Sequence, residues 1–562
     1  MKEAREPQPP RRGRTGLIVG FSIVILLFLI TRLPFFLDAP FWGVFPDSAG
    51  YYIPVDQISK GFFPTFTART PGYPLFLGLV FLFLDSNLGA IAVQNALSLL
   101  SALLFVFVIY RVYAGRFPWM PAAAGAALGV FIASTVHLSA DTSLLTESLY
   151  VSCIVVFFAF LLEALHGRRH WPWIMAGCAF TAALLVRPSA LFLVPVIFLV
   201  LFFLLVNRRG LRPVLAFVLP PCITLLALAS YNHFTIGAFS ASTFGEHALV
   251  SFTNTLMTPH PSYPEPMNAA ITRCLNRIRP LHRQVIETSR DPERINRILQ
   301  KYYNLNRRLM FNTLSRREDP QAADLYMKWR PMLRRAGWDA IRSRPAIYLK
   351  FVASNLQVYL FHRKTDHDFY AALQRRRALA HRYRQRFSGR SAEEIFRALR
   401  IYYKQDYLDT LSIGFSRAFL KEYWDLDPLD KDGIHHLLKQ PLQLGFLHRV
   451  HRFVEHWHNT LFRSNLWIYL YFAVLLVTLS RWILSRFRHL GAFVLAVLTV
   501  SALLHGVLVS MSALPTDRLN YPLDYVIYLA PLLLPLALRA DPRERDASGK
   551  DDLSERAEIS SP

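Results

Sequence analysis

Long runs of apolar residues separated by short polar segments dominate the chain up to residue 231 and again after residue 466. Most hold about 18 to 25 residues, which is the length that an α-helix needs to cross a ~30 Å hydrocarbon core. Lipid offers no partner for backbone polar groups, so such runs are expected to be transmembrane helices. About ten are expected, and they lie at Gly16–Leu37, Ala90–Tyr113, Pro121–His137, Leu144–Leu165, Trp173–Val186, Ala190–Val206, Val214–Tyr231, Leu466–Leu484, Ala492–Met511 and Leu523–Leu538. The pattern predicts an all-α polytopic membrane protein.

The segment between these two groups of runs has a different pattern. Residues 232–463 are polar and rich in Arg, with helical periodicity over residues 273–304, 322–342 and 392–407. We expect a mostly helical region outside the membrane. Within it, the apolar stretch 345–362 carries Lys350, which favours a helix at the membrane interface over a further span.

Five parts follow from this division of the chain. They are a cytoplasmic tail (1–15), an N-terminal membrane module (16–231) that includes a first external loop (38–89), the mostly helical extracytoplasmic region (232–463), the C-terminal membrane helices (464–539) and a disordered cytoplasmic tail (540–562).

Basic residues in the short loops predict the orientation. The chain carries a formal net charge of +24, and Arg residues recur in the N-terminal tail and in every second loop between the expected spans. Because short basic loops stay in the cytoplasm, both termini are expected there, and residues 232–463 on the opposite face. A basic region on that face does not meet nucleic acid, so membrane lipids are the partners that the charge indicates.

Ionisable side chains gather on the extracytoplasmic side of this expected topology. Charged groups near membrane depth cost several kcal/mol unless they are paired or solvated, so they are candidates for function. The candidates come from four separate loops: Asp47, Arg69, Tyr73, His137, Asp141, Glu147, Arg187, Arg518 and Tyr521. Their convergence on one face predicts an active site at the membrane surface that handles an anionic group.

Each candidate also has a structural interpretation. Asp47 is suited to cap a helix that starts at Ser48, and Arg69 to anchor the chain at the lipid headgroups. Asp141 and Glu147 would pair with Arg187 or Arg518 in a buried network. His137 is expected to be an interfacial histidine rather than a metal ligand. Asp47, His137, Asp141 and Glu147 are nevertheless the residues that would hold a divalent ion, if the site takes one.

Five short motifs occur in a fixed order along the chain. They are PDSAGYY from residue 46, ARTPGYPLFLGL from 68, LLTESLY from 144, LLVRPSALFLVP from 184 and PTDRLNYPLDYVIYLAPLL from 515. Together they resemble the GT-C class of membrane glycosyltransferases, close to bacterial relatives of the dolichyl-phosphate-mannose–protein mannosyltransferases and of the lipid A aminoarabinose transferase. The resemblance covers residues 16–231 and 466–538 and implies a GT-C bundle in a bacterial inner-membrane protein.

The resemblance also implies roles for single residues. Asp47 matches the catalytic base of the family, although this chain has Ser48 where many relatives have a second acid. Residues 69–74, which include Tyr73, match a loop near the lipid phosphate. Glu147, with Asp141 as its rival, matches the acid at the start of the fourth span. Arg187 with Pro188 matches the family's Arg-Pro pair, and Arg518 with Tyr521 matches its basic and aromatic residues before the last span.

The residue types fit this chemistry on their own terms. Transfer of a sugar from a polyprenyl phosphate needs a base for the acceptor hydroxyl and positive charge for the departing phosphate. Asp47 would supply the base, and Arg69, Arg187 and Arg518 the guanidinium groups, which bind phosphate oxygens bidentately. Direct displacement would invert the anomeric carbon. The acceptor would be a lipid, a polysaccharide or a protein on the extracytoplasmic face.

Two other classes of protein remain open. A transporter or flippase for an anionic lipid-linked substrate would use the same charges as a path, but it favours charges at the midplane and helices broken within the membrane. A noncatalytic assembly partner would use residues 232–463 for adhesion.

Overall fold

The computed structural model describes residues 11–38, 70–84, 87–142, 144–167, 169–207, 210–237, 239–241, 244–292, 323–361, 465–485 and 489–512, with scattered residues between 51 and 61, between 294 and 310 and between 530 and 538. Every regular element in this part of the chain is a helix, and none of it is a strand. The all-α class predicted from the sequence is confirmed.

A bundle of apolar helices forms the larger part of the molecule. Its members are α1 (Arg11–Asp38), α3 (Gly72–Leu84), α4 (Asn87–Tyr113), α5 (Met120–Ala133), α6 (Thr135–Asp141), α7 (Thr146–His166), α8 (Trp171–Val186), the 3₁₀ helix η1 (Pro188–Leu193), α9 (Val194–Val206), α10 (Leu211–Ile236), α23 (Asn465–Leu484) and α24 (Leu490–Ser512). Five of the described helical stretches are long and apolar enough to cross a membrane: α1, α4, α7, η1 with α9, and α10. Five others are apolar but shorter, namely α3, α5, α8 and the apolar parts of α23 and α24. The chain is therefore an α-helical membrane protein.

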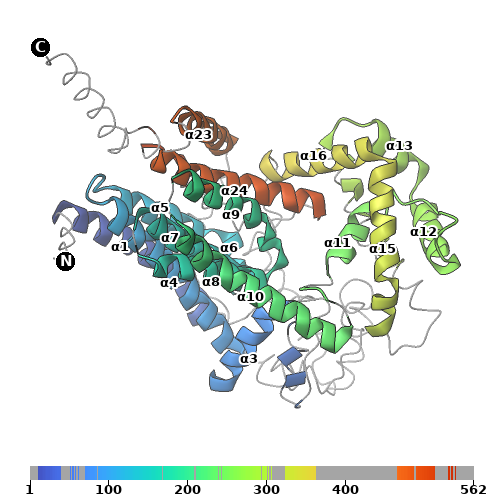
Figure 1. Ribbon diagram of the computed structural model, residues 1–562, viewed down its shortest axis with the longest axis horizontal. Coiled ribbons are helices and arrows are strands. Elements are labelled where there is room, and N and C mark those ends of the chain that lie inside the picture. The colour runs from blue at the N-terminus through green and yellow to red at the C-terminus, as the bar shows by residue number, and fades with distance from the viewer. Residues whose placement is uncertain are drawn as a thin grey trace, which may run out of the picture.

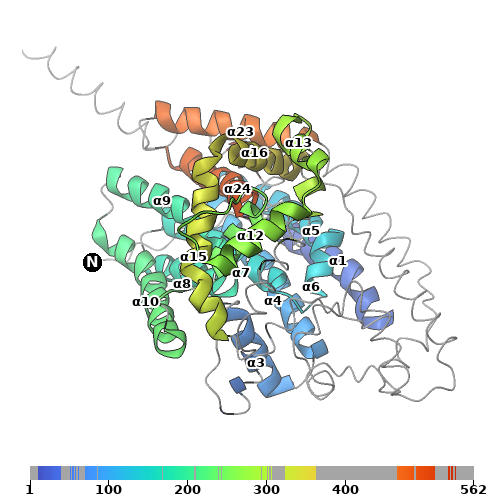
Figure 2. The ribbon, with the colours of Figure 1, turned by 90° about the vertical axis from the view of Figure 1, so that its right-hand side faces the viewer.

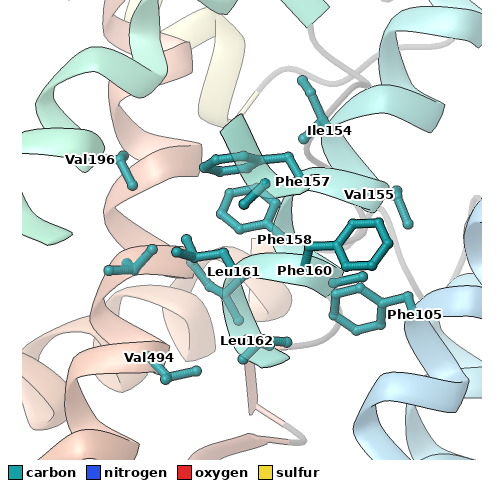
Figure 3. Packing of buried hydrophobic residues seen from close by; sticks show 14 of the residues in the cluster. Phe105, Ile154, Val155, Phe157, Phe158, Phe160, Leu161, Leu162, Val196 and Val494 are labelled. Atoms are coloured by element: carbon teal, nitrogen blue, oxygen red, sulfur yellow. The ribbon is translucent and has the colours of Figure 1, made fainter. Parts of the chain in front are cut away.

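Helix α7 forms the centre of the bundle. In its most apolar window 78% of the residues are buried inside the protein, against 22% for α10. Its Phe157, Phe158 and Leu161 pack in one core that reaches from Phe105 of α4 to Val494 of α24 (Figure 3). A helix that is apolar all round suits this central place, because neighbours cover it on every side.

Small residues let α1 and α5 pack at very close range. A side chain at Gly125 would bring its first carbon within 2.4 Å of the Gly20 carbonyl oxygen, and one at Gly20 would come equally near the carbonyl oxygen of Pro121. Gly16 and Gly129 continue the same contact one turn away on each helix. Glycines four residues apart are typical of closely packed membrane helices, because the backbones themselves form the interface.

The helices after α10 form a second body beside the bundle. They are α11 (Phe244–Thr253), α12 (Glu265–Arg277), α13 (Pro280–Thr288), α15 (Ala323–Ser343) and α16 (Pro345–Phe361). Figure 1 shows α12 and α15 far from α1, and Figure 2 shows the same two helices in front of the bundle. They share a separate apolar core that includes Met267, Ile271, Leu333 and Phe351. Helix α16 leads back to the bundle, where Leu360 packs against Ile468 of α23.

Several elements differ from the prediction. The segment expected as an external loop contains α3, an apolar helix whose Leu82 and Phe83 are each 76% exposed, as suits a lipid-facing wall. The expected third span ends at Ala133, and the separate helix α6 carries the chain from there to Asp141. The expected helix over 273–304 is broken at Pro280, whose ring excludes the helical conformation for Arg279 before it.

Other predicted segments are matched or lie outside the described residues. Helix α15 matches the expected helix over 322–342. Helix α1 begins at Arg11, inside the segment expected as a tail. Residues 392–407, most of the expected tenth span and the tail 540–562 lie outside the described residues. The number of ten spans therefore stays a prediction.

Candidate functional site

The site is built around the junction between α5, α6 and α7. Ser134 ends α5 and caps α6, because its hydroxyl accepts a hydrogen bond from the His137 backbone N–H at 3.3 Å. Helix α6 then runs for seven residues to Asp141, and α7 starts at Thr146. Two carboxylates, Asp141 and Glu147, thus stand at the two sides of one short turn.

Asp141 forms a fully buried ion pair with Arg32 of α1. The Arg32 Nη2 lies 2.6 Å from Asp141 Oδ2, and the two side chains are 1% and 0% exposed. The Arg32 Nη1 donates to the Ile132 carbonyl oxygen at 2.6 Å and to the Thr31 hydroxyl at 2.8 Å. The other carboxylate oxygen, Asp141 Oδ1, accepts a hydrogen bond from the Ser148 hydroxyl at 2.6 Å. A buried charge of this kind is tolerated only because partners surround it.

Helix α4 adds two further contacts to this network. The Asn95 amide donates to the Asp141 carbonyl oxygen at 2.9 Å. The His137 Nε2 lies 2.8 Å from the Ser98 hydroxyl and 3.4 Å from Asp141 Oδ2. His137 is 1% exposed, so it is a buried member of the network and not the interfacial histidine expected from the sequence. The physical reason is that α6 turns it towards α4 instead of towards the bundle surface.

Glu147 pairs with Arg187. Their closest atoms, Glu147 Oε1 and Arg187 Nη1, lie 3.1 Å apart, and the Thr146 hydroxyl donates to Glu147 Oε2 at 3.2 Å. Glu147 lies in the first turn of α7, where the positive end of the helix dipole favours a carboxylate. Arg187 ends α8 in an extended conformation that the following Pro188 imposes. The expected pairing of Glu147 with Arg187 is confirmed. Among the described residues, Asp141 pairs with Arg32, and Arg518, its other expected partner, lies outside them.

Arg187 is the more exposed side chain of this pair. Its side chain is 16% exposed while that of Glu147 is 1% exposed. The guanidinium carbon stands 5.7 Å from the centre of the Tyr150 ring, a distance at which an aromatic face attracts a cation. A guanidinium that is fixed by a buried carboxylate and an aromatic ring, but still open on one side, is suited to bind an anion.

Residues from the first two sequence motifs reach the same place. The Tyr51 hydroxyl lies 3.4 Å from that of Thr146, next to Glu147 in the chain. The Thr70 hydroxyl donates to the Val186 carbonyl oxygen at 3.2 Å, next to Arg187. The rings of Tyr51 and Tyr73 meet edge to face, with centres 4.9 Å apart. Tyr73 is fully buried, and its hydroxyl donates to Gln94 of α4. It therefore packs beneath Tyr51.

Four of the expected site residues, Asp47, Arg69, Arg518 and Tyr521, lie outside the described residues. Tyr51 follows Asp47 by four positions, and Thr70 follows Arg69 directly. The described candidates His137, Asp141, Glu147 and Arg187 are brought together at one end of the bundle, through the contacts given above.

The described candidates do not form a metal centre. Among the described residues no group of three or more His, Cys, Asp or Glu side chains could hold a metal ion. Both carboxylate oxygens of Asp141 bind protein groups, and Arg32 already supplies the positive charge there. The substrate-binding role expected for Asp141 stays a prediction, and in the structure its carboxylate is buried against Arg32 and Ser148. Asp47, the fourth candidate ligand, lies outside the described residues.

Arg32 is the residue of the site that sequence reasoning missed. It belongs to Gly13–Leu33, a stretch of 21 residues whose most apolar 18-residue window has a mean hydropathy of 2.5, and one charge changes such an average little. The signal that identifies it is a charged side chain within a predicted span, which always needs a named partner.

Comparison with known proteins gives no match, whether to a family model, to a curated protein or to a solved structure.

Proposed function

We propose that the protein is a membrane glycosyltransferase that moves a sugar from a polyprenyl-phosphate donor to an acceptor at the membrane surface. The observation that carries the proposal is the arrangement of Arg187, a partly exposed guanidinium held by buried Glu147. The resemblance of the five sequence motifs to GT-C enzymes supports the same function. The donor phosphate is the anion that such a guanidinium suits, because it can accept two parallel N–H···O bonds.

The reaction would proceed by direct displacement. Asp47 takes the proton of an acceptor hydroxyl while the acceptor oxygen forms a bond to the anomeric carbon. The bond from that carbon to the phosphate oxygen breaks, and both electrons leave with the polyprenyl phosphate. Arg187, with Arg69 and Arg518, stabilises the negative charge that builds up on the leaving phosphate. The configuration at the anomeric carbon is inverted.

Contacts of the described residues support this division of labour. Thr70 bonds next to Arg187, and Arg69 precedes Thr70 in the chain, so the proposal assigns both arginines to one phosphate. Tyr51 bonds next to Glu147 and belongs to the same motif as Asp47. The described candidate residues lie together at one end of the bundle, which favours a surface enzyme over a transporter whose charges follow a path across the membrane.

A transfer assay with matched variants tests the proposal. The full-length protein in lipid nanodiscs is given radiolabelled polyprenyl-phosphate sugars, with cell-envelope material from a deletion strain as acceptor. Arg187→Gln is expected to lower the transfer rate by about 10²- to 10³-fold, as loss of a charge-stabilising donor does. Asp47→Asn is expected to lower it by about 10²- to 10⁴-fold.

Arg111→Gln is the matched control. Arg111 also pairs with a glutamate, Glu163, at 2.5 Å, but its side chain is 36% exposed and α4 places it far from the site. Its removal should leave transfer unchanged. Full activity in a folded Arg187→Gln variant would contradict the proposal. Movement of unlabelled polyprenyl phosphate across proteoliposomes, without sugar transfer, would favour a flippase instead.

A further inference from the structure

We infer that Arg32 and Asp141 are positioning residues that hold Glu147 in place, and through it Arg187. The inference deepens the proposed function, because it names what fixes the phosphate-binding guanidinium. The geometric part of the inference concerns only how Arg187 is held, so it can be tested without any substrate.

The chain of contacts runs through Ser148. Asp141 Oδ2 is fixed by Arg32 at 2.6 Å, and Asp141 Oδ1 accepts the Ser148 hydroxyl at 2.6 Å. Ser148 directly follows Glu147 in the first turn of α7. A displacement of Asp141 therefore moves the backbone that carries Glu147, and the Glu147–Arg187 contact at 3.1 Å depends on that backbone.

The start of α7 depends on these contacts because it has no cap of its own. The residue before the helix is Leu145, which offers no side-chain hydrogen bond to the first turn. Helices normally begin at a side chain that accepts one of the free N–H groups, and such a cap fixes the helix end. Here the first turn of α7 is held instead by the Ser148 side chain, which bonds to Asp141 of α6, and Asp141 in turn pairs with Arg32 of α1.

Because the three residues of this network are buried, each depends on its protein partners. Arg32, Asp141 and Ser148 are at most 1% exposed, so water is not at hand to replace a lost partner. The Asn95 amide holds the Asp141 backbone from α4 at 2.9 Å, which leaves the carboxylate little freedom to turn. The network thus connects α1, α4 and α6 to one turn of α7.

Arginine labelling tests the positioning directly. Folded full-length protein in nanodiscs is treated with phenylglyoxal, and the modification rate of each arginine is measured by peptide mass spectrometry. Asp141→Asn removes the charge that pairs with Arg32, and Ser148→Ala removes the hydrogen bond to Asp141. Each is expected to raise the rate at Arg187 by about three- to tenfold, because the Glu147 contact loosens. Arg111, in the same sample, provides the internal reference and should not change.

Tyr471→Phe is the control for general loosening. Tyr471 is 1% exposed and its hydroxyl donates to the Thr499 carbonyl oxygen, so it ties α23 to α24 away from the α6–α7 junction. This variant should leave the rate at Arg187 unchanged. An unchanged rate in folded Ser148→Ala, or an equal rise in Tyr471→Phe, would overturn the inference.

A second measurement separates this inference from the proposed function. Binding of polyprenyl phosphate by the purified protein is measured by native mass spectrometry. Ser148→Ala is expected to weaken it by about three- to tenfold, the same change as for the labelling rate. If the wild-type protein neither binds polyprenyl phosphate nor transfers sugar, the proposed function fails, whereas the labelling result still decides the positioning. If the wild type binds but Ser148→Ala binds equally well, the positioning fails and the proposed function stands.

Discussion

Two ion pairs of nearly equal length lie at opposite ends of the bundle. Arg32–Asp141 is 2.6 Å long and Arg111–Glu163 is 2.5 Å long. Helix α4 passes both, with Asn95 at the first pair and Arg111 in the second, and the helix rises by about 24 Å from one to the other. Distance does not distinguish the two pairs, but exposure does: 1% and 0% against 36% and 12%.

The difference in exposure separates a positioning contact from a surface contact. At the exposed Arg111–Glu163 pair, water and salt ions replace a lost partner. Such a pair contributes about 0 to 1 kcal/mol to the free energy of unfolding. The Arg32–Asp141 pair is buried, so water does not replace a lost partner, and each buried charge depends on the other. The candidate site lies beside the buried Arg32–Asp141 pair, where a network of buried contacts couples the position of one helix to that of another.

The largest effect is expected from removing one member of the buried pair. Arg32→Met leaves Asp141 buried without its cation, and the free energy of unfolding should fall by about 3–5 kcal/mol. The double variant Arg32→Met/Asp141→Leu should recover most of that loss, because it removes both charges of the pair. Equilibrium unfolding in mixed micelles measures both. A single variant no less stable than the double would break the comparison.

A medium effect is expected at the contact that seats α1. Gly125→Leu would force α1 away from α5, with a loss of about 1–3 kcal/mol from overpacking. Because α1 carries Arg32, the cost of Arg32→Met should be smaller in this background than in the wild type. Gly78→Leu is the matched control, since nothing lies within 4 Å of a side chain placed there. Equal costs in both backgrounds would show that α1 does not set the buried pair.

A smaller effect with a defined pH dependence is expected outside the bundle. The Tyr263 hydroxyl donates to Asp339 Oδ2 at 2.6 Å, and burial, then the hydrogen bond and the charge of Asp339, raise the pKa of Tyr263 to about 12. The unfolded chain loses this proton near pH 10. The stabilisation is therefore complete below about pH 10 and is lost as the pH rises towards the folded pKa.

Tyr263→Phe tests this contact. The variant should be less stable than the wild type by about 1 kcal/mol at neutral pH. The gap between the two should close as the pH rises above 10, as measured by pulse proteolysis of α12, α13 and α15. A gap that stays constant up to pH 11 would show that the phenol of Tyr263 does not titrate with folding.

The smallest effect is expected at the exposed pair. Arg111→Gln should change the free energy of unfolding by less than about 1 kcal/mol, and the change should shrink further in 0.5 M salt. The same unfolding measurement serves. A cost near that of Arg32→Met would mean that exposure is not what separates the two pairs.

The sequence predicted the helices better than their ends. Helix α15 matches its expected range because apolar positions recur at the helical period, and local periodicity is a property of the sequence alone. Helix α3 lies in the segment predicted as an external loop, and its 13 residues are fewer than a membrane span needs. Whether so short an apolar helix lies in water or against a bundle is decided by the helices beside it.

The candidate site was predicted in part. The pairing of Glu147 with Arg187 was expected as one interpretation, and it is found. The expected partners of Asp141 are Arg187 and Arg518, of which Arg518 lies outside the described residues; the partner found among the described residues is Arg32, 109 positions away in the chain. The orientation in the membrane, the sugar-transfer function and the roles of Asp47, Arg69, Arg518 and Tyr521 stay predictions.

The sequence by itself determined that this chain is a helical membrane protein, because the length and apolarity of a segment fix its solvent and its backbone hydrogen bonds. It also determined which side chains were candidates, because charge inside or beside a span needs a reason. Only the tertiary structure decided which carboxylate meets which guanidinium. The Arg32–Asp141 pair joins α1 to α6 across 109 positions of the chain, and such a contact depends on how the helices pack, which no local pattern contains.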